Sequence, residues 1–460
     1  MQDSENIQYP GDVSIDEISL TVSDGTVHPL DAGEATEIIL QESIFSYGLF
    51  GTVTIADSKN MIGDFPIVGG EVLTLKLRTK TFPDEEDFII HKSFQIYAIT
   101  DRGTLNDREQ TYVLRFCSLE VVADTPTPIY RAFPGTDAKS YNTADIAINI
   151  YEQYISKETP RIYSKPKSRT KLMMSGKHSS EVQYVSNGWT PAQNMNFLCK
   201  RITQEEDDTQ CDNVFYESNK AWYLTSIQSL IGLQLNDRFD EYIFGSNPQT
   251  SRVGEYTSID LSSQGFNTIE EMNIPRTIDV LDNSMNGYYS SNVVGYDMFT
   301  KTRAELAFDI EEDFDKQVHT DKFVPMPNHI NRSPGAKTTA RVLNSSVYYG
   351  MVGGIYDKGS QASSPTHLTG TTTRTTYFSS FNDYTIEIDV PGRTDIQCGV
   401  LIYVKYPRPV SKSGDETYLE DEIMSGNYLV TSIAHTITSA GHNMKMEIIK
   451  NGLAKELGKT

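Results

Sequence analysis

The sequence has few cysteines and no long apolar run. Its 460 residues include 4 cysteines, Cys117, Cys199, Cys211 and Cys398, which lie far apart without C-x-x-C spacing. They predict buried free thiols in a reducing cytoplasm and argue against a disulfide framework or a zinc site. No stretch reaches the roughly 18–20 apolar residues of a transmembrane helix, so no membrane insertion is expected. Residues 1–6 also lack the basic and apolar regions of a secretory signal.

Positive charge is scarce. The chain has 40 Lys+Arg against 62 Asp+Glu, a formal net charge of −22. Gripping nucleic acid requires clustered lysine and arginine, and an anionic membrane surface attracts basic segments, so both partners are disfavoured. The acidity favours solubility, and it also suits the wall of a passage to which DNA does not adhere.

Catalytic motifs are missing. The sequence contains no G-x-x-x-x-G-K-S/T or G-x-G-x-x-G loop, no G-x-S-x-G elbow and no H-E-x-x-H helix. His435 and His442 are seven residues apart, a poor spacing for metal ligands, and are interpreted as surface or hairpin histidines. The acidic runs Glu205–Asp208 and Glu311–Asp313 lack the ligand pattern of a calcium loop and are interpreted as solvated loops. The sequence therefore predicts no enzyme, with no catalytic, metal or cofactor-binding site and no cofactor.

Alternating apolar and polar residues dominate both ends of the chain. Val53 and Ile55 share one strand face, as do the leucines of 71–78, and this pattern up to about residue 120 predicts an antiparallel barrel or sandwich. Alternation returns in Tyr256–Leu261 and Asn292–Phe299. Four further strands are predicted near the end of the chain: Tyr384–Val390, Gly399–Tyr406, Tyr428–Thr438 and Met444–Lys450.

The middle of the chain is mixed. Asn142–Ile155 carries a helical apolar stripe, and a second helix is predicted to begin at Thr190 as N-cap, with Pro191 at its first position and Gln193 completing a capping box. A hairpin is predicted over Val214–Leu224. The two tryptophans, Trp189 and Trp222, are assigned to core packing.

One long stretch has a different composition. Gly350–Thr376 is rich in glycine, serine and threonine and predicts a loop or extended arm. The order of segments along the whole chain then gives the fold class, a β-dominated α+β protein with a β-rich segment at each end and an α/β segment between them.

The order of four motifs resembles the central baseplate hub protein of contractile-tailed phages (the T-even-type hub family), which is related to the hub part of type VI secretion spike proteins. The motifs are Gln41–Ile44 followed by Gly51–Asn60, the Trp189-Thr190-Pro191 helix start, Ser291–Asp297, and Asp389–Gly392 followed by Gly426–Thr436. The residues taken as fold signatures are Val53, Ile55, Trp189, Thr190, Pro191, Gly392, Tyr428, Val430 and His435.

The resemblance implies two antiparallel β-barrels that are similar to a tail-tube subunit, with an inserted α/β domain. The first barrel would span 12–120. The second would be assembled from 252–283 and 381–456, and the inserted domain from 121–251 and 284–380. Three copies would form a ring that adapts a sixfold tail tube to a threefold spike in a virion baseplate assembled in the host cytoplasm.

The partners implied by the resemblance are two further copies in a homotrimer, a trimeric central spike protein, a tail-tube initiator or tube protein, and a tape-measure protein. DNA would pass through the lumen during virus entry without specific binding, between walls that carry part of the negative charge. The alternatives are another ring component of a tail or injection machine, a carbohydrate-active tail protein, and a soluble β-sandwich binding module. A glycan-degrading tail enzyme would be expected to show sequence repeats and more than 2 tryptophans.

Overall fold

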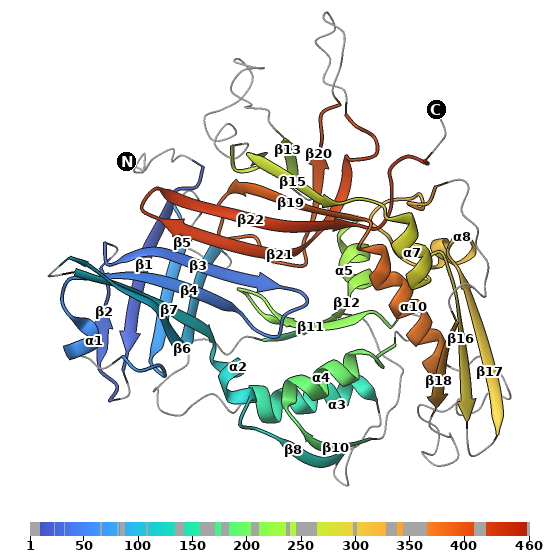
Figure 1. Ribbon diagram of the computed structural model, residues 1–460, viewed down its shortest axis with the longest axis horizontal. Helices are drawn as coiled ribbons and strands as arrows, with labels where there is room; N and C mark the ends of the chain where they lie inside the picture. The colour runs from blue at the N-terminus through green and yellow to red at the C-terminus, as the bar shows by residue number, and fades with distance from the viewer. Residues whose placement is uncertain are drawn as a thin grey trace, which may run out of the picture.

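The chain folds around one large, mainly antiparallel sheet, shown in Figure 1 for a computed structural model. The structure describes residues 10–22, 24–31, 33–64, 67–80, 82, 88–106, 109–133, 142–156, 171–175, 184–203, 211–235, 240–244, 265–297, 301–327, 338–343, 366–408 and 420–457. Fourteen strands belong to the large sheet, and strands outnumber helices throughout these residues. The β-dominated fold class expected from the sequence is confirmed.

The N-terminal β unit contains seven strands and two short helices. Its elements are β1 (Val13–Thr21), β2 (Val27–Pro29), β3 (Ala35–Ser43), β4 (Phe50–Asp57), α1 (Met61–Asp64), β5 (Val72–Thr79), β6 (Ile89–Asn106), β7 (Glu109–Ser118) and α2 (Leu119–Asp124). The strands pair antiparallel in the order β2-β1-β5-β6-β7-β4-β3. Side chains from strands at both ends of this order share one core, which includes Ile18, Ile38 and Leu75. The sheet is therefore rolled around its own apolar face.

The C-terminal β unit gathers strands from two separated parts of the chain. It contains β13 (Glu241–Phe244), β14 (Thr268–Ile269), β15 (Glu271–Arg276), β19 (Tyr384–Pro391), β20 (Leu401–Lys405), β21 (Gly426–Thr438) and β22 (Gly441–Lys450). These strands enclose a second core, to which Tyr242, Ile388 and Met446 belong. The four strands predicted near the end of the chain are β19 to β22 and are confirmed.

A seam joins the two β units into one sheet. Strand β21 pairs antiparallel with β3 over seven residue pairs, from Ser432 opposite Ser43 to Thr438 opposite Glu37. Figure 1 shows β21 and β22 lying beside β3 and β4. Ile437 of β21 packs into the core of the N-terminal unit, so the seam is closed by side chains as well as by backbone hydrogen bonds.

Strand β21 is buried on both faces at its start. Sequence alternation left open whether Leu429, Thr431 and Ile433 or the opposite set faces inward. In the structure Tyr428 to Thr431 are all buried, since Tyr428 and Val430 enter the core of the C-terminal unit while Leu429 enters a neighbouring core. A register shift between Val430 and Ser432 then turns Ile433, His435 and Ile437 inward.

Helices and short strands between the two units form a third core. The elements are β8 (Ile129–Phe133), α3 (Thr143–Ile150) with a π-helical turn (Tyr151–Ile155), β9 (Leu172–Met174), β10 (Tyr184–Trp189), α4 (Pro191–Cys199), β11 (Asn213–Glu217), β12 (Trp222–Ser226) and α5 (Ile227–Gln234). The predicted capping box is confirmed, because Thr190 accepts from the Gln193 backbone N–H while the Gln193 side chain accepts from the Thr190 N–H. The two helices and the β11–β12 hairpin are also confirmed.

A small sheet and further helices complete the chain. They are α7 (Val280–Asn286), β16 (Ser290–Asp297), β17 (Thr302–Asp309), α8 (Ile310–Asp313), a 3-10 turn (Phe314–Lys316), β18 (Thr338–Leu343) and α10 (Thr366–Ser380).

Two loop predictions were wrong. Residues 366–376 of the Gly/Ser/Thr-rich stretch belong to α10, and Glu311–Asp313 lies in α8, where these acids follow the N-cap Asp309 and favour the helix dipole. The predicted features over 204–208, 256–261 and 350–365 lie outside the described residues.

Candidate functional site

The solvent-facing side of the joined sheet is a continuous polar face that crosses the seam. Cross-strand neighbours on this side form rows that run from the N-terminal unit to the C-terminal unit. One row is Phe50, Gln41, Ala434, Lys445, Asp389 and Glu271, and the next is Ser43, Ser432, Glu447, Glu387 and Asn273. Ser432 Oγ donates to Ser43 Oγ across the seam at 2.9 Å. Each row continues from one unit into the other, so the outward-facing side chains of both units lie on the same side of the sheet.

Carboxylates outnumber cations in the two rows that cross the seam. Their acids are Glu271, Glu387, Asp389 and Glu447, and their one cation is Lys445. Lys445 pairs with Glu387 at 2.8 Å, and this bond lowers the pKa of Glu387. A hollow of about 320 Å³ lies over the seam between Gln41, Ser432 and Lys445. The face is therefore anionic and concave where the two units meet.

Glu42 anchors three segments behind the seam. Its carboxylate accepts the backbone N–H of Asn219 at 2.8 Å and that of Cys398 at 2.7 Å. These partners come from the β11–β12 turn and from the loop before β20, so one side chain links both β units to the middle core. Burial raises the pKa of Glu42 to about 7, because removal from water penalises its charge.

A buried ion pair lies beside Glu42. Lys92 of β6 contacts Glu217 of β11 at 2.9 Å, and Ser118 donates to the same carboxylate. Lys92 also donates to the backbone carbonyl of Ser218. Burial, followed by repulsion from Glu217, raises the pKa of Glu120 to about 8. This polar junction fixes how the hairpin β11–β12 sits on the N-terminal unit.

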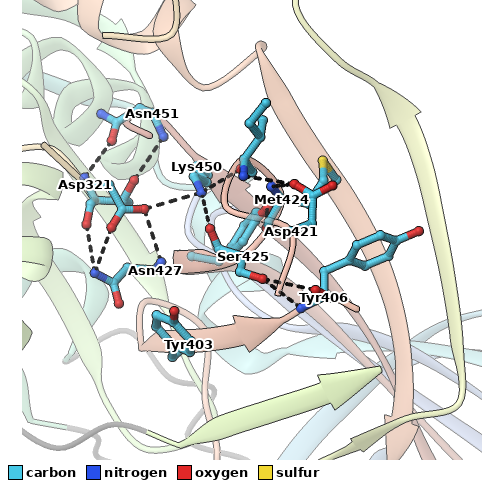
Figure 2. A network of polar contacts seen from close by, with 12 residues as sticks. Asp321, Tyr403, Tyr406, Asp421, Met424, Ser425, Asn427, Lys450 and Asn451 are labelled. Atoms are coloured by element: carbon cyan, nitrogen blue, oxygen red, sulfur yellow. Dashed lines mark hydrogen bonds and ion pairs between the residues drawn. The ribbon is translucent and has the colours of Figure 1, made fainter. Parts of the chain in front are cut away.

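A second polar network fixes the far end of β22, as Figure 2 shows. Lys450 is fully buried, donates to the carbonyls of Ile423 and Ser425 at 3.0 and 2.7 Å, and lies 3.4 Å from the Asp321 carboxylate. Asp321 also accepts from the side-chain amide of Asn427. Burial lowers the pKa of Lys450 and raises that of Asp321. The network ties the segment after α8 to the last strands of the C-terminal unit.

The two histidines of the closing hairpin are buried, so the surface interpretation was wrong. His435 Nδ1 and His442 Nε2 lie 3.1 Å apart, and both residues have no exposed surface. The other ring nitrogen of each has no hydrogen-bond partner among the described residues. Burial lowers the pKa of His435 to about 4, and burial followed by the neighbouring ring lowers the pKa of His442. Both rings are therefore neutral at pH 7.

The packing around Gly392 leaves no room for a side chain. A Cβ added there would lie 2.1 Å from the His442 ring, so no side chain fits without displacing the histidine pair. The Gly392 N–H also donates to the His442 carbonyl at 2.7 Å. The sequence analysis named Gly392 as a fold signature but did not place it against His442, because the two positions are 50 residues apart in the sequence.

The remaining signature residues are distributed over separate cores. Val53 and Ile55 lie in the N-terminal core, and Tyr428 and Val430 lie in the C-terminal core. Trp222 is buried as expected, whereas the assignment of Trp189 to core packing was wrong. Trp189 is 36% exposed and leans on the Phe197 ring at 5.1 Å, because its position at the end of the two-stranded ribbon leaves one side open.

The described residues contain no cluster of three or more His, Cys, Asp or Glu side chains arranged to hold a metal ion. All four cysteines are free and buried, as expected from their spacing. Among the described helices, none has the length and apolar character needed to cross a membrane. The polar clusters described above are contacts that hold strands and turns together.

The sequence matches no protein-family model and no curated protein. Solved structures are similar in fold. A 43 kDa tail protein of prophage MuSo2 from Shewanella oneidensis superimposes with a TM-score of 0.52 at 10% identity, over 95% of this chain and 98% of that chain. A tail protein from Neisseria meningitidis gives 0.50 at 10% identity, over 96% and 99%. A type VI secretion system component of E. coli gives 0.41 at 7% identity, over 91% and 73%. The chain thus has the fold of phage tail proteins.

Proposed function

We propose that the chain is a structural hub subunit of a contractile phage-tail baseplate, which assembles as a trimer and surrounds a passage for DNA. The observation that carries this proposal is the seam between β3 and β21. It places two rolled β units side by side with one shared polar face, the arrangement that neighbouring subunits of a tube wall require. Three such chains supply six β units, enough to match a sixfold tube on one side and a threefold spike on the other.

The polar face is the proposed wall of the passage. The four carboxylates against one cation in the two rows that cross the seam repel the phosphate backbone, so DNA slides without adhering. Because the rows of side chains cross the seam without interruption, the wall is continuous within each chain. The proposed partners at the two ends of the passage are the spike protein and the tube or tube-initiator protein, with the tape-measure protein inside.

The proposed domain limits follow the cores with one adjustment. The N-terminal unit corresponds to the expected barrel over 12–120, and β15 with β19 to β22 falls within the second barrel over 252–283 and 381–456. Strand β13 pairs with β20 and contributes Tyr242 to the same core, so we extend the second barrel to include 240–244. The inserted domain keeps the rest of 121–251 and 284–380.

The proposal assigns no catalysis to the chain. The residues with strongly shifted pKa, such as Glu42, Glu120 and His435, are buried in contacts between segments and not exposed at one cleft. Glu42 holds the β11–β12 turn and the loop before β20, and His435 hydrogen-bonds His442 inside the β21–β22 hairpin, so both have structural contacts.

The oligomeric state tests the proposal directly. Mass photometry of the purified chain, alone and with the candidate spike protein, should reveal a trimer in at least one condition. A chain that stays monomeric with every candidate tail partner, or that degrades bacterial surface glycans, would contradict the hub assignment.

The passage is tested separately by a map of the assembled trimer. Glu271, Asp389 and Glu447 should face the central axis. If the polar face is covered by a neighbouring chain or lies on the outside, the passage is refuted while the trimer stands.

A further inference from the structure

The two β units repeat one arrangement of seven strands. In the N-terminal unit the strands pair in the order β2-β1-β5-β6-β7-β4-β3. In the C-terminal unit they pair in the order β14-β13-β20-β21-β22-β19-β15. When the strands of each unit are counted along the chain, the two orders are identical. Strand β21 therefore corresponds to β6, and β15 corresponds to β3.

Backbone hydrogen bonds fix the correspondence between β6 and β21 residue by residue. The Gly70 N–H donates to the Ile96 carbonyl, and the Gly399 N–H donates to the Val430 carbonyl, both at 2.8 Å. Both glycines have a positive φ and lie two residues before the next strand, β5 or β20. The register with the hairpin partner then shifts directly after Ile96 in β6 and directly after Val430 in β21. Ile96 thus takes the place of Val430.

Rows of cross-strand pairs extend the correspondence to β3 and β15. One row leads from β6 to β3 through Ile96, Phe116, Gly51 and Leu40. The matching row leads from β21 to β15 through Val430, Ile448, Ile386 and the bulge at Ile274 and Pro275. The bulge in β15 therefore takes the place of Leu40, and Asn273 takes the place of Ile39.

The two corresponding strands differ in what their second halves contact. After its register shift, β21 leaves β20 and pairs with β3 over Ser432–Thr438. After the same shift β6 leaves β5, and up to Asn106 it pairs only with β7 among the described residues. The outer edge of β15 likewise has no partner strand in the part of the chain that the structure describes. Figure 1 shows β6 and β15 on opposite sides of the seam, so each chain carries both halves of a second seam, one at each end of its wall.

Side chains at these two edges are more exposed than their counterparts in the seam. Ile274 of β15 is 36% exposed, whereas Leu40 at the same place in β3 is 1% exposed. Tyr97, which follows Ile96 in β6, is 50% exposed, whereas Thr431 at the same place in β21 is fully buried. Pairing of the two edges would bury an isoleucine and a tyrosine, and this burial would stabilise the contact.

We propose that the outer edge of β15 in one chain pairs antiparallel with the second half of β6 in the next chain, as β3 pairs with β21 within one chain. The inference rests on the proposed function, which supplies the three copies, and it names the edges that join them. Each chain offers a different edge to each neighbour, and a head-to-tail contact of this kind forms a ring when it closes. Pro275 has no N–H group, so the pairing covers 271–274 of β15 and is shorter than the seam.

The seam also predicts the register between chains. Ile39 lies opposite Thr436 in the seam. Counted along the β6–β7 and β21–β22 hairpins, Gly103 takes the place of Thr436. Gly103 of one chain should therefore lie opposite Asn273 of the next chain.

Cysteine cross-linking tests both the pairing and its register. The Ile44 N–H bonds to the Thr431 carbonyl at 2.9 Å. Because bonded and non-bonded pairs alternate, the pair five places further, which corresponds to Gly103 and Asn273, is non-bonded, with Cα atoms about 4.5 Å apart. Gly103→Cys combined with Asn273→Cys should therefore form a disulfide between chains. Both positions are exposed, an added Cβ at Gly103 meets only ordinary contacts, and the four native cysteines are buried.

The oxidised double variant, taken from the fraction that mass photometry shows to be trimeric, should run as a covalent trimer on a non-reducing gel. Each single variant should remain unlinked, because a head-to-tail contact never brings two copies of one residue together. Gly103→Cys with Glu271→Cys moves one partner by two places, to about 7–8 Å, and should not be bridged. Ser43→Cys with Ser432→Cys should oxidise within one chain and confirms that the conditions suffice.

The outcomes separate the strand pairing from the proposed function. A trimer that does not cross-link, or that cross-links equally well through the shifted pair, refutes the pairing and leaves the trimer in place. Cross-linked dimers of a single variant would show a twofold contact and refute the pairing as well. A chain that is monomeric with every candidate partner refutes the proposed function and the pairing together.

Substitutions at the edges provide a second test without cross-linking. Ile274→Lys should raise the concentration at which the trimer is half dissociated about tenfold or more, because a lysine on a strand edge opposes pairing. Ile274→Val should leave it unchanged. Val27→Lys places the same charge at an exposed position on β2, another outer strand, and should also have no effect. If Val27→Lys weakens the trimer as much as Ile274→Lys, the chains join through other edges and the proposal is wrong.

Discussion

Acid should loosen the seam between the two β units through His435. Its pKa falls from 6.5 in water to about 4 in the folded chain, because burial penalises the charged ring. Above pH 6.5 neither state binds the proton, so this histidine adds no pH dependence. Between pH 6.5 and pH 4, His435 is protonated in the unfolded or locally opened state but stays neutral in the folded state. The free energy of opening therefore falls as the pH is lowered through this range.

The size of the effect follows from the two pKa values. Lowering the pH from about 7.5 to about 5 should reduce the free energy of opening by about 2 kcal/mol for His435 alone. His442 acts in the same direction. Since β21 pairs with β3 through Leu40 opposite His435, the amides of both strands report the loss. Relative to a variant that does not titrate at position 435, their exchange rates, corrected for intrinsic chemistry, should rise about 30-fold more on this acidification in hydrogen-exchange mass spectrometry.

A variant isolates the histidine from other titrating groups. Glu42 has a raised pKa, so its contribution to stability increases as the pH falls from about 7 and opposes that of His435. In His435→Asn the amide keeps a hydrogen-bonding atom near the position of Nδ1 but does not titrate. The difference between wild type and His435→Asn at each pH cancels Glu42. An equal response of the two proteins to acid would refute the reasoning.

Substitutions at three other positions probe two buried polar contacts and one helix cap. Lys450→Met should lower the free energy of unfolding by about 3–5 kcal/mol in thermal melting at neutral pH, because Asp321 stays buried without its cation; a loss under about 1 kcal/mol would show that the pair is effectively solvated. Glu42→Gln should cost about 1–3 kcal/mol, since an amide has one acceptor oxygen for the two N–H groups that Glu42 binds. Thr190→Ala should cost about 1 kcal/mol and Thr190→Ser much less, because serine can restore the cap.

Local patterns in the sequence predicted much of the secondary structure. The capping box at Thr190 is specified within four residues, and strands such as β4 and β19 are specified by alternation with one buried side. These features depend on neighbours in the sequence, so they can be read without the tertiary structure. The order of β-rich and mixed segments was predicted for the same reason, and the fold similarity to tail proteins agrees with it.

Features that depend on distant residues could not be predicted. His435 has an ordinary strand position, and its burial follows only from the seam with β3 and from the ring of His442. Alternation did not choose a face for β21 because that strand serves two cores and shifts register at Thr431. The stretch at 366–376 was assigned to a loop on composition, but α10 packs Tyr377 into a core, together with Phe381 just after its end, and this burial compensates for its weak helix formers.

The seam also joins two strands that are synthesised far apart in time. Ser43 and Ser432, which meet across it, are 389 residues apart in the chain. At a translation rate of about 5–20 residues per second, β21 is synthesised about 20–80 s after β3, and the outer edge of β3 stays unpaired until then. During that interval a nearly finished N-terminal unit presents an unpaired strand edge, a template for pairing with other nascent chains. Truncated chains that lack β21 should therefore aggregate through β3, and expression of the N-terminal unit alone should require a mutation or a chaperone that covers this edge.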